Sequence, residues 1–516
     1  MELIGRLIKR AFELRNLPQK VKKANRKPVK EQERVLKKLL IKAQFTIFGE
    51  DYNFYKILSS KNIIENFRKN VPIFDYKSMY KRYWYRLLNG ESFVCWPSHV
   101  KYFALSSGTS EASSKYIPVT RSMIKSIKRA SIRQLVSMVN YKFPLEFYNK
   151  GMLMIGGSTH LNYNGKYYAG DLSGITANKI PFWFQHWYKP GKTISQSSDW
   201  NLKLEEIVNA APSWDIGVIV GVPAWVQIIF EKIIERYNLK NIHEMWPNLN
   251  IYVHSGVSIK PYLKTFNKLF GKKIFYIESY LASEGYIAYK TDPDALGMEL
   301  ITNNGIYFEF VPFTPENFDE EANIRSNAST YWLKEVENNI EYALLISTNA
   351  GAWRYLIGDT IIFTDKDKSE IQITGRTKQF LSVCGEHLSL ENLSRAVEIL
   401  QDKLNIEICE FTVFAQPHKN LFEHIWYLGS NDKIDNNLAA KIIDAELSTL
   451  NDDYRVERME AIKLVKVESI SCEIFYKFME KNNKLGGANK FPRVLKGERI
   501  QEWQNFLEEQ SIKSKN

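Results

Sequence analysis

The sequence has only four cysteines in 516 residues, Cys95, Cys384, Cys409 and Cys472, and none of them falls in a paired metal-ligand spacing. Together with the lack of a recognisable signal peptide, this scarcity argues against a disulfide framework or a zinc site. We therefore expect a cytoplasmic protein whose thiols stay reduced.

The sequence also lacks a long hydrophobic run. Its most apolar stretch, residues 216–234, is interrupted by Pro223, Gln227, Glu231 and Lys232. This pattern indicates a buried strand, a turn and a helix, and we expect no stable membrane insertion. No internal repeat or low-complexity block stands out. With 44% hydrophobic residues over this length, the chain has material for two or more packed domains.

Positive charge is unevenly distributed along the chain. The formal net charge is +12, but residues 1–38 hold 13 Lys or Arg against 4 Glu, so 12 − 9 leaves about +3 for the rest. A groove that binds nucleic acid would carry cations interleaved with aromatic residues, so we expect no nucleic-acid partner. We interpret the basic segment as the solvated face of a helix pair, with weak attraction to an acidic surface as the alternative.

The order of apolar runs predicts the fold class. Residues 1–45 are expected to be helical, punctuated by Pro18 and Pro28. Between about 100 and 375, short apolar runs alternate with helical stretches, as at residues 152–155, 216–220, 251–254 and 274–277. This alternation predicts an α/β fold of packed β-sheets with flanking helices, with ligands at the carboxyl ends of strands.

We expect a domain boundary after Arg376. Residues 1–376 would form a large N-terminal domain, and residues 377–516 a smaller, mobile α+β domain. Within the smaller domain, the pattern predicts helices at 390–400 and 439–450 and strands at 410–414, 424–428 and 461–467.

The most informative segment is SSGTSEASSK, from Ser106 to Lys115. Its small residues let backbone N–H groups surround an anion, its hydroxyls add donors, and its final lysine supplies a positive charge. A polar surface loop is the alternative interpretation. The candidate phosphate-binding residues of this loop are Ser106, Ser107, Gly108, Thr109, Ser110 and Lys115.

Two later segments carry side chains suited to the rest of a nucleotide. In ESYLASEG, Tyr280 is suited to stack on a base, Ser283 to bind a phosphate oxygen, and Glu284 to bind magnesium. In WRYLIGDT, Asp359 is expected at a glycine turn at a strand end, where it would accept hydrogen bonds from ribose hydroxyls. Taken one at a time, a core aromatic, a surface glutamate and an ordinary Gly-Asp turn are the alternatives.

Two basic segments follow. ITGRTKQFLSVCGEHL places Arg376, a further candidate nucleotide-binding residue, just before the expected boundary. GGANKFPR carries Lys490 and Arg493 near the end of the small domain. The alternative for the second segment is a basic hairpin exposed to water.

In this order, the segments resemble the motifs of the Gretchen Hagen family of acyl acid amido synthetases (the auxin-responsive promoter family), here of bacterial type. That family belongs to the luciferase-like, adenylate-forming superfamily. The resemblance makes SSGTSEASSK the phosphate loop, YLASEG the nucleotide and metal motif, WRYLIGD the ribose motif and NKFPR the catalytic-lysine segment. It also implies that HSGVSIKPY lines the adenine, with Gly256, Val257 and Ser258 nearest. The resemblance runs from FGEDYNF, at residues 48–54, to Arg493.

The sequence departs from the expected motifs at two places. Ala112 stands where the phosphate loop of the family has a glycine. Thr377 and Lys378 follow Arg376 where the superfamily often has an aspartate, so the exact pivot between the domains stays open. Plant residues that grip auxin or jasmonate do not map onto this chain, so no plant hormone is implied as a substrate.

The resemblance implies an ATP- and Mg²⁺-dependent ligase. A carboxylic acid would be adenylated to acyl-AMP, and the acyl group would then pass to an amine, such as an amino acid, to form an amide. Residues 1–376 would bind ATP and the acyl acid, with the acyl pocket among residues 120–230. Lys490 and Glu284 would be catalytic, and Lys490 would reach the α-phosphate only if the small domain swings.

Two other functions remain open at this stage. An acyl-CoA ligase would share the first half-reaction and use a thiol acceptor, and a non-catalytic nucleotide-binding protein would keep only the binding site. A P-loop kinase is disfavoured because GxxxxGK[ST] is absent. The acid, the amine and the oligomeric state, a monomer included, are left open.

Overall fold

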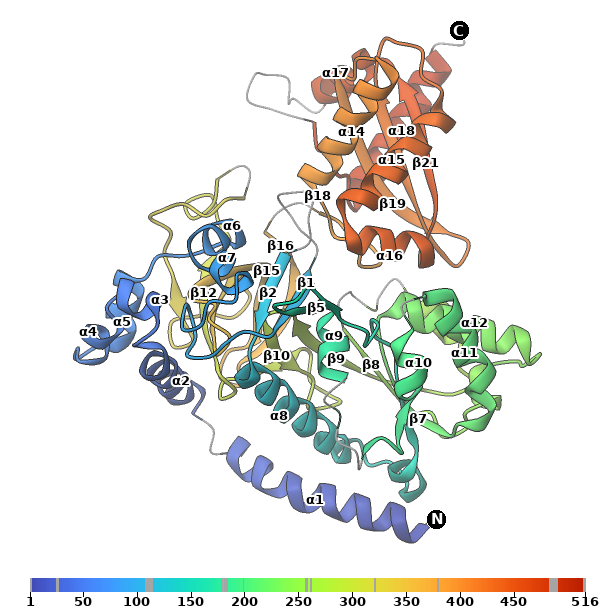
Figure 1. The fold of residues 1–516 in the computed structure, drawn as a ribbon. Helices are drawn as coiled ribbons and strands as arrows, with labels where there is room; N and C mark the ends of the chain where they lie inside the picture. The colour runs from blue at the N-terminus through green and yellow to red at the C-terminus, as the bar shows by residue number, and fades with distance from the viewer. Residues whose placement is uncertain are drawn as a thin grey trace. The chain divides into compact units, whose positions relative to one another are not determined.

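The chain folds into two compact units (Figure 1). This computed structural model describes residues 2–24, 27–106, 115–177, 180, 184–197, 199–255, 259, 262–319, 322–377, 380–481 and 491–513. The large unit comprises Met1–Ser106 and Lys115–Thr377, and the small unit includes Lys378–Asn516. The division falls one residue beyond the expected boundary.

Two helices open the large unit, as predicted for residues 1–45. These are α1 (Glu2–Ala24) and α2 (Pro28–Ala43), and Pro28 occupies the first turn of α2, where its missing N–H costs nothing. Buried Gln32 fixes α2 to a strand, because its amide donates to Thr302 O and Ile306 O and accepts from Phe308 N. Shorter helices follow: α3 (Ile47–Asp51), α4 (Phe54–Leu58), α5 (Ile63–Asn70), α6 (Tyr76–Met79) and α7 (Tyr85–Leu88).

One half of a 12-stranded sheet is parallel. In spatial order its strands are β6 (Tyr188–Lys189), β3 (Gly151–Met154), β7 (Ile216–Val220), β8 (Ile251–His254) and β9 (Phe275–Ala282). All four predicted strands are confirmed, and the last of them runs five residues further than expected. The near-continuous burial of β7 and β8 is typical of strands covered on both faces.

The other half of this sheet is antiparallel, and β9 is the strand at which the direction changes. From β9 the order continues through β10 (Gly285–Tyr289), β11 (Met298–Leu300), β16 (Glu370–Arg376), β15 (Tyr355–Asp365), β14 (Glu341–Thr348), β12 (Ile306–Pro312) and β13 (Tyr331–Trp332). The ends of distant segments therefore meet around β9 and β10.

The described part of the large unit also contains a four-stranded sheet and six further α-helices. The sheet has the order β2 (Lys115–Val119), β1 (Tyr102–Ser106), β5 (Tyr168–Gly170) and β4 (Asn162–Tyr163). The helices are α8 (Arg121–Ser137), α9 (Leu172–Ala177), α10 (Lys192–Gln196), α11 (Trp200–Ala210), α12 (Pro223–Arg236) and α13 (Leu263–Leu269). The predicted α/β class is confirmed.

The small unit has the α+β character that its pattern predicts. Its three-stranded sheet has the order β19 (Glu410–His418), β20 (Leu421–Gly429) and β21 (Ile462–Ile470). A short pair, β17 (Phe380–Leu381) and β18 (Leu388–Ser389), precedes it. The helices are α14 (Leu390–Leu404), α15 (Asn436–Leu450), α16 (Asp452–Glu460), α17 (Cys472–Lys481) and α18 (Glu498–Lys513).

The cysteines of the small unit correct one expectation. Cys409, just before β19, forms a disulfide with Cys472, the first residue of α17, with their Cα atoms 6.2 Å apart. The expectation of no disulfide is therefore wrong for this pair. The two cysteines are 63 residues apart in the sequence, and only the folded sheet brings them together. Cys95 and Cys384 are buried free thiols.

Candidate active site

Five of the predicted site residues, from β2, β9, the turn after β9, β15 and β16, lie close together in the large unit. They are Lys115, Tyr280, Glu284, Asp359 and Arg376. Asp359 and Arg376 are direct partners in the β15–β16 register, and Arg376 Nε lies 2.8 Å from Asp359 Oδ1. The charges of Lys115, Asp359 and Arg376 all act on Glu284. Segments up to 261 residues apart in the sequence thus form one charged cluster.

The Asp359 carboxylate is held by two side chains of this cluster, one on each of its oxygens. It is 6% exposed, and besides Arg376 it accepts a hydrogen bond from the Tyr280 hydroxyl at Oδ2. Burial and the neighbouring carboxylate raise the pKa of Tyr280, so this hydroxyl keeps its proton and donates it. Each carboxylate oxygen has a second lone pair, so Asp359 can still accept from two further hydroxyls. The expected contact of the Tyr280 ring with a base stays a prediction.

The backbone around Asp359 differs from the expectation. Asp359 does not end a strand but is the fifth of the 11 residues of β15. The β14–β15 register steps from Ala343↔Thr360 to Leu345↔Leu356, so residues 357–359 form a bulge. Gly358 has φ +93°, which favours glycine, and its carbonyl accepts from Thr377 N at 2.9 Å. The predicted glycine turn is thus a bulge inside a strand.

Glu284 occupies the tight turn between β9 and β10. Only 9% of it is exposed, and burial raises the pKa of its carboxyl to about 7, although the charge of Lys115 opposes the shift. A carboxylate that is buried without enough donors favours a proton or a cation. Gly285, the next residue, has φ +149° and a Cβ there would meet Ile306 Cδ1 at 2.9 Å, so the turn requires glycine.

Ser106 and Lys115 are the described residues on either side of the predicted phosphate loop. They are partners at the ends of β1 and β2, and the Lys115 ammonium lies 5.5 Å from the centre of the Tyr76 ring. A cation over an aromatic face is held electrostatically while its N–H donors remain able to reach an anion. Ser283 lies beside Glu284 in the β9–β10 turn and is partly exposed.

The remaining predicted site residues lie outside the described residues. They are Ser107, Gly108, Thr109, Ser110, Gly256, Val257, Ser258 and Lys490. Their roles stay predictions.

The segment that follows Lys490 is firmly anchored in the small unit. Val413 N donates to Arg493 O and Leu495 N donates to Val413 O, so this segment continues the sheet beside β19. The Phe491 ring packs 4.8 Å from that of Phe475. Arg493 forms an ion pair with Glu410. These contacts hold Phe491, the first described residue after Lys490, in place in the small unit.

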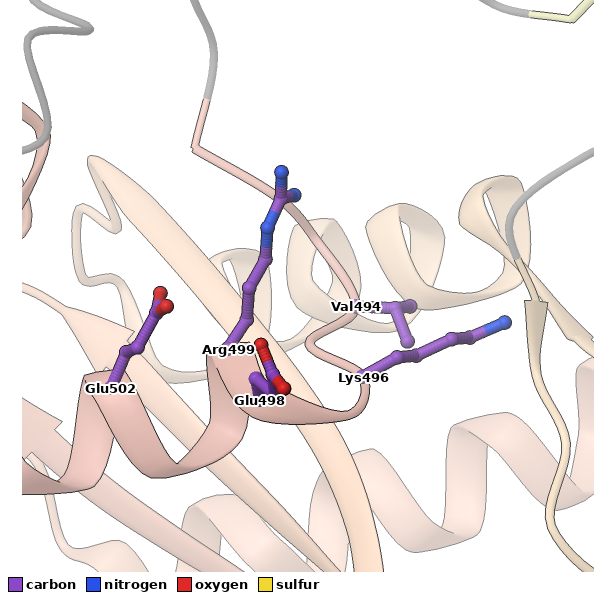
Figure 2. A pocket seen from close by; sticks show the side chains of 5 residues that line it. All are labelled: Val494, Lys496, Glu498, Arg499 and Glu502. Atoms are coloured by element: carbon purple, nitrogen blue, oxygen red, sulfur yellow. The ribbon is translucent and has the colours of Figure 1, made fainter.

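A cavity of about 480 Å³ lies near this segment. Figure 2 shows Lys496, just before α18, and Arg499, in its first turn, extending in different directions. The cavity is lined by Val494, Lys496, Glu498, Arg499 and Glu502. Two cations and two carboxylates share the lining, and none of these residues belongs to the predicted site.

The first half of the WRYLIGD segment is structural. Trp353 is fully buried and donates from its indole N–H to Cys95 O at 3.1 Å. Arg354, 4% exposed, pairs with buried Glu309 at 3.1 Å and donates to the carbonyls of Arg68 and Val71. These contacts fix the start of β15, and through it the bulge that carries Asp359.

Two buried residues near strand ends escaped the sequence reasoning. His254 ends β8, is 4% exposed, and its Nδ1 has no hydrogen-bond partner among the described residues; burial lowers its pKa to about 4. Lys203 of α11 donates to Gly156 O at 2.6 Å, and burial lowers its pKa to about 8. Lys203 has no local sequence signal, because its environment comes from other segments. His254 is the first residue of the HSGVSIKPY motif, but the motif does not show that its side chain is buried.

Family models cover most of the chain. The GH3 family N-terminal domain matches residues 18–205 and 158–275, the central domain residues 299–376, and the C-terminal domain residues 391–499. The chain belongs to the GH3 family. The family predicted from the motifs is thereby confirmed.

Curated relatives are amido synthetases of plants. The jasmonoyl–L-amino acid synthetase JAR6 of Nicotiana attenuata is 24% identical, and the match covers 95% of this chain and 94% of that protein. The jasmonoyl–L-amino acid synthetase GH3.5 of Oryza sativa subsp. japonica is 26% identical; the chain spans about half of its length, 48%, and the match takes 52% of this chain. These names support the predicted enzyme class, a carbon–nitrogen ligase.

Solved structures confirm the fold. The GH3.15 acyl acid amido synthetase in complex with 2,4-DB has a TM-score of 0.56 at 16% identity over 93% of both chains. A 2-hydroxyisobutyryl-CoA ligase in its thioesterification state has a TM-score of 0.60 at 14% identity, over 94% of this chain and 93% of that one. An acyl acid amido synthetase and a CoA ligase thus share this fold.

Proposed function

We propose that this GH3 protein joins a carboxylic acid to an amine in two half-reactions driven by ATP. In the first, a carboxylate oxygen attacks the α-phosphorus of ATP, and the bond to pyrophosphate breaks. In the second, the amine nitrogen attacks the acyl carbon, loses a proton and displaces AMP. AMP is a good leaving group, so the amine can form the amide at neutral pH. A free carboxylate has no comparable leaving group.

One observation carries this proposal: Lys115, Glu284, Asp359 and Arg376 share one charged cluster although they come from four separate strands or turns. Phosphoryl-transfer catalysis consists chiefly of positioning and of neutralising charge. The cluster offers cations for phosphates and a buried carboxylate for hydroxyls. Family membership supports the same chemistry.

In this proposal each residue has a separate task. Lys115 and the serines and threonine of the phosphate loop hold the β- and γ-phosphates. Asp359 accepts from the ribose hydroxyls, while Arg376 and the Tyr280 hydroxyl hold it in place. Tyr280 acts on the ribose through Asp359 and, by resemblance, also contacts the adenine.

Glu284 fits a magnesium ion. Its raised pKa shows that burial outweighs the charge of Lys115, and a divalent cation would favour the ionised form. Among the described residues no cluster of three or more His, Cys, Asp or Glu side chains forms a metal cage. That agrees with Mg²⁺, which is commonly bound by one or two carboxylates together with substrate phosphates. When bound, the ion would neutralise charge on the phosphates.

Lys490 is proposed to stabilise the charge that grows on the α-phosphate and the departing oxygen. Lys490→Ala should then lower adenylation roughly 10²–10³-fold while ATP binding is nearly unchanged. Pyrophosphate release at the rate of the unmodified enzyme would contradict this role. The assignment rests on the NKFPR motif and on the firm anchorage of the residues that follow it.

ATP–pyrophosphate exchange tests the first half-reaction. The intact protein is screened with a panel of aryl and aliphatic acids, and Asp359→Asn is compared with Glu33→Gln, a change on the exposed side of α2. We expect exchange with at least one class of acid, a strongly raised KM for ATP in Asp359→Asn, and no change in Glu33→Gln. Equal exchange in all three proteins would refute the site.

The acceptor needs its own test, because the fold is shared by a CoA ligase. Preformed acyl-AMP is mixed with the enzyme and either single amino acids or coenzyme A, and the product is identified by mass spectrometry. An acyl-amino acid would support the amido synthetase, which the names of the curated relatives favour. A thioester alone would favour the acyl-CoA ligase.

The cytoplasm remains our proposed compartment, since ATP and amino acids are supplied there. The Cys409–Cys472 disulfide makes this testable, because disulfides are uncommon in reducing compartments. Thiol alkylation in intact cells, followed by peptide mapping, would show whether the pair is reduced where the protein works.

A further inference from the structure

Helix α1 presents two different faces. Its inner face is fixed to the large unit: Phe12 packs edge-on against Tyr148 at 6.2 Å, and Asn16 donates to Asn140 at 3.0 Å. Ile8 joins the same apolar cluster. Figure 1 shows α1 running along one side of this unit next to α8. These contacts attach the inner face of the helix to the large unit.

The outer face of α1 carries exposed leucines. Leu7, Leu14 and Leu17 are 61%, 63% and 54% exposed, although leucine is usually buried. Leu7 and Leu14 are seven residues apart, which is two helical turns or about 10 Å, and Leu17 follows one turn later. The three side chains therefore form one stripe opposite the face that packs on the protein.

Cations flank this stripe. Arg6, Arg10 and Arg15 are exposed on the same helix. In the whole of α1, seven residues are Lys or Arg and two are Glu, a net charge of 7 − 2 = +5. An apolar stripe bordered by cations is typical of helices that lie in the interface of a membrane with anionic headgroups.

We infer that α1 is a docking surface for an anionic lipid bilayer, on which the protein adsorbs peripherally. The leucines would enter the headgroup region while the arginines contact the anionic headgroups. The helix would lie on the bilayer without crossing it, and none of the helices in the described part of the chain is long and apolar enough to cross one.

Other occupants match the surface less well. A second copy of the chain would bring the same excess of positive charge against itself, which opposes association. The phosphates of a nucleic acid would bind the arginines, but the hydrated phosphate backbone would bury little apolar surface of the leucines. The bilayer is the partner that uses both kinds of side chain. The inference does not depend on the proposed ligase activity.

Co-sedimentation of the full-length protein with vesicles tests this inference. We compare phosphatidylcholine vesicles with vesicles that also contain about 30 mol% phosphatidylglycerol. The expected result is at least about tenfold stronger partitioning onto the anionic vesicles, which weakens as salt rises from about 0.05 to about 0.5 M. Equal partitioning onto both vesicle types, or none onto either, would overturn the inference.

Matched variants separate the two contributions. Leu7→Ser with Leu14→Ser should weaken partitioning about tenfold, because each loses apolar burial while the charge is unchanged. Arg6→Gln with Arg10→Gln and Arg15→Gln should remove the preference for anionic lipid. Leu296→Ser is the control, since Leu296 is 77% exposed elsewhere on the same unit and should change nothing.

Two outcomes would replace the bilayer by another partner. A concentration-dependent dimer in vesicle-free solution, abolished by the leucine variant, would assign the face to a second copy. Binding to duplex DNA that the arginine variant abolishes and the leucine variant leaves intact would assign it to nucleic acid. ATP–pyrophosphate exchange with a water-soluble acid should be equal in all variants, which confirms that they are folded.

Discussion

The large and the small unit each bury a glutamate in a turn beside a strand, and the two carboxyls titrate in opposite directions. Burial raises the pKa of Glu284 to about 7. Glu386, fully buried before β18, is also penalised by burial, but its partners outweigh that penalty and lower its pKa to about 2. The same side chain is thus half protonated near neutral pH in one unit and ionised in the other.

The difference lies in the number of donors that each unit supplies. Glu386 accepts from the backbone N–H groups of Val383, Cys384 and Gly385 at 2.9–3.1 Å, and His424 Nε2 lies 3.1 Å from Oε1. The four lone-pair positions of Glu386 are therefore occupied within its own unit. Glu284 has cationic neighbours, Lys115 and Arg376, but burial outweighs them. The Glu386 carboxylate, held by donors of its own unit, fixes a loop, whereas we expect the Glu284 carboxylate, whose charged form burial disfavours, to bind a cationic ligand.

The largest expected effect separates these two roles. Glu284→Gln should lower ATP–pyrophosphate exchange about 10³-fold, because the neutral amide cannot hold the cation that neutralises the phosphates. Initial exchange rates at saturating ATP measure the loss, and Glu33→Gln is the control. If Glu284→Gln keeps more than a tenth of the activity at ordinary magnesium concentration, Glu284 is no metal ligand.

Glu386→Gln should act on stability. The variant removes a buried charge that His424 and three N–H donors compensate, and breaking such a cluster costs about 3 kcal/mol. Denaturant unfolding measures the total, and hydrogen exchange of β20 peptides locates the loss in the small unit. Because the folded-state pKa is lowered, the stabilisation by Glu386 is present above the ordinary value of 4.5 and is lost only as pH falls toward 2. An unchanged β20 would contradict the comparison.

The same substitution in the large unit should have the opposite sign. The pKa of Glu284 is raised in the folded state, so its favourable contribution is present below 4.5 and is lost as pH rises through 7. Glu284→Gln should therefore stabilise the protein by about 2–3 kcal/mol at pH 8 and by little at pH 5. Thermal unfolding at both pH values, without magnesium and ATP, measures this. A destabilised variant at pH 8 would show that Glu284 is already satisfied.

The strands of the parallel half were predictable from local sequence. β7 and β8 coincide with the predicted runs 216–220 and 251–254, because a strand buried on both faces needs an unbroken apolar run. The motifs that meet at Glu284 and Asp359 were also predictable, since hydroxyl, carboxylate and lysine side chains in that order match the family. Local composition and motif chemistry were sufficient there.

Contacts between distant segments were not predictable. The hydrogen bond from Tyr280 to Asp359 joins residues 79 apart, and the disulfide joins residues 63 apart. Asp359 was expected at a strand end, because Gly358 signals a turn but not whether the strand resumes after it. The pairing of Glu386 with His424 depends on the sheet register of the small unit, which no local pattern encodes.

The disulfide offers a smaller test of the small unit. Reducing Cys409–Cys472 should lower its stability by about 2 kcal/mol, because the open form gains chain entropy on unfolding. Unfolding curves with and without reductant measure the difference. In the double variant Cys409→Ser with Cys472→Ser, the free energy of unfolding should not depend on the reductant. If peptide mapping of the oxidised protein finds the two cysteines unlinked, the disulfide is refuted. The pKa of the Glu284 carboxyl, which lies in the other unit, should not change when the disulfide is reduced.

The magnesium requirement should follow the pKa of Glu284. A proton and a cation compete for the carboxylate, so below pH 7 the apparent affinity for Mg²⁺ should fall about tenfold per pH unit, about 1.4 kcal/mol, and it should level off above pH 8. Magnesium titrations of the exchange reaction between about pH 5.5 and 8.5 measure this. Glu284→Gln, assayed through its residual activity, should retain only the pH dependence of ATP itself. If the unmodified enzyme and Glu284→Gln show the same pH dependence, Glu284 does not bind the magnesium ion, and in this respect it does not differ from Glu386 of the small unit.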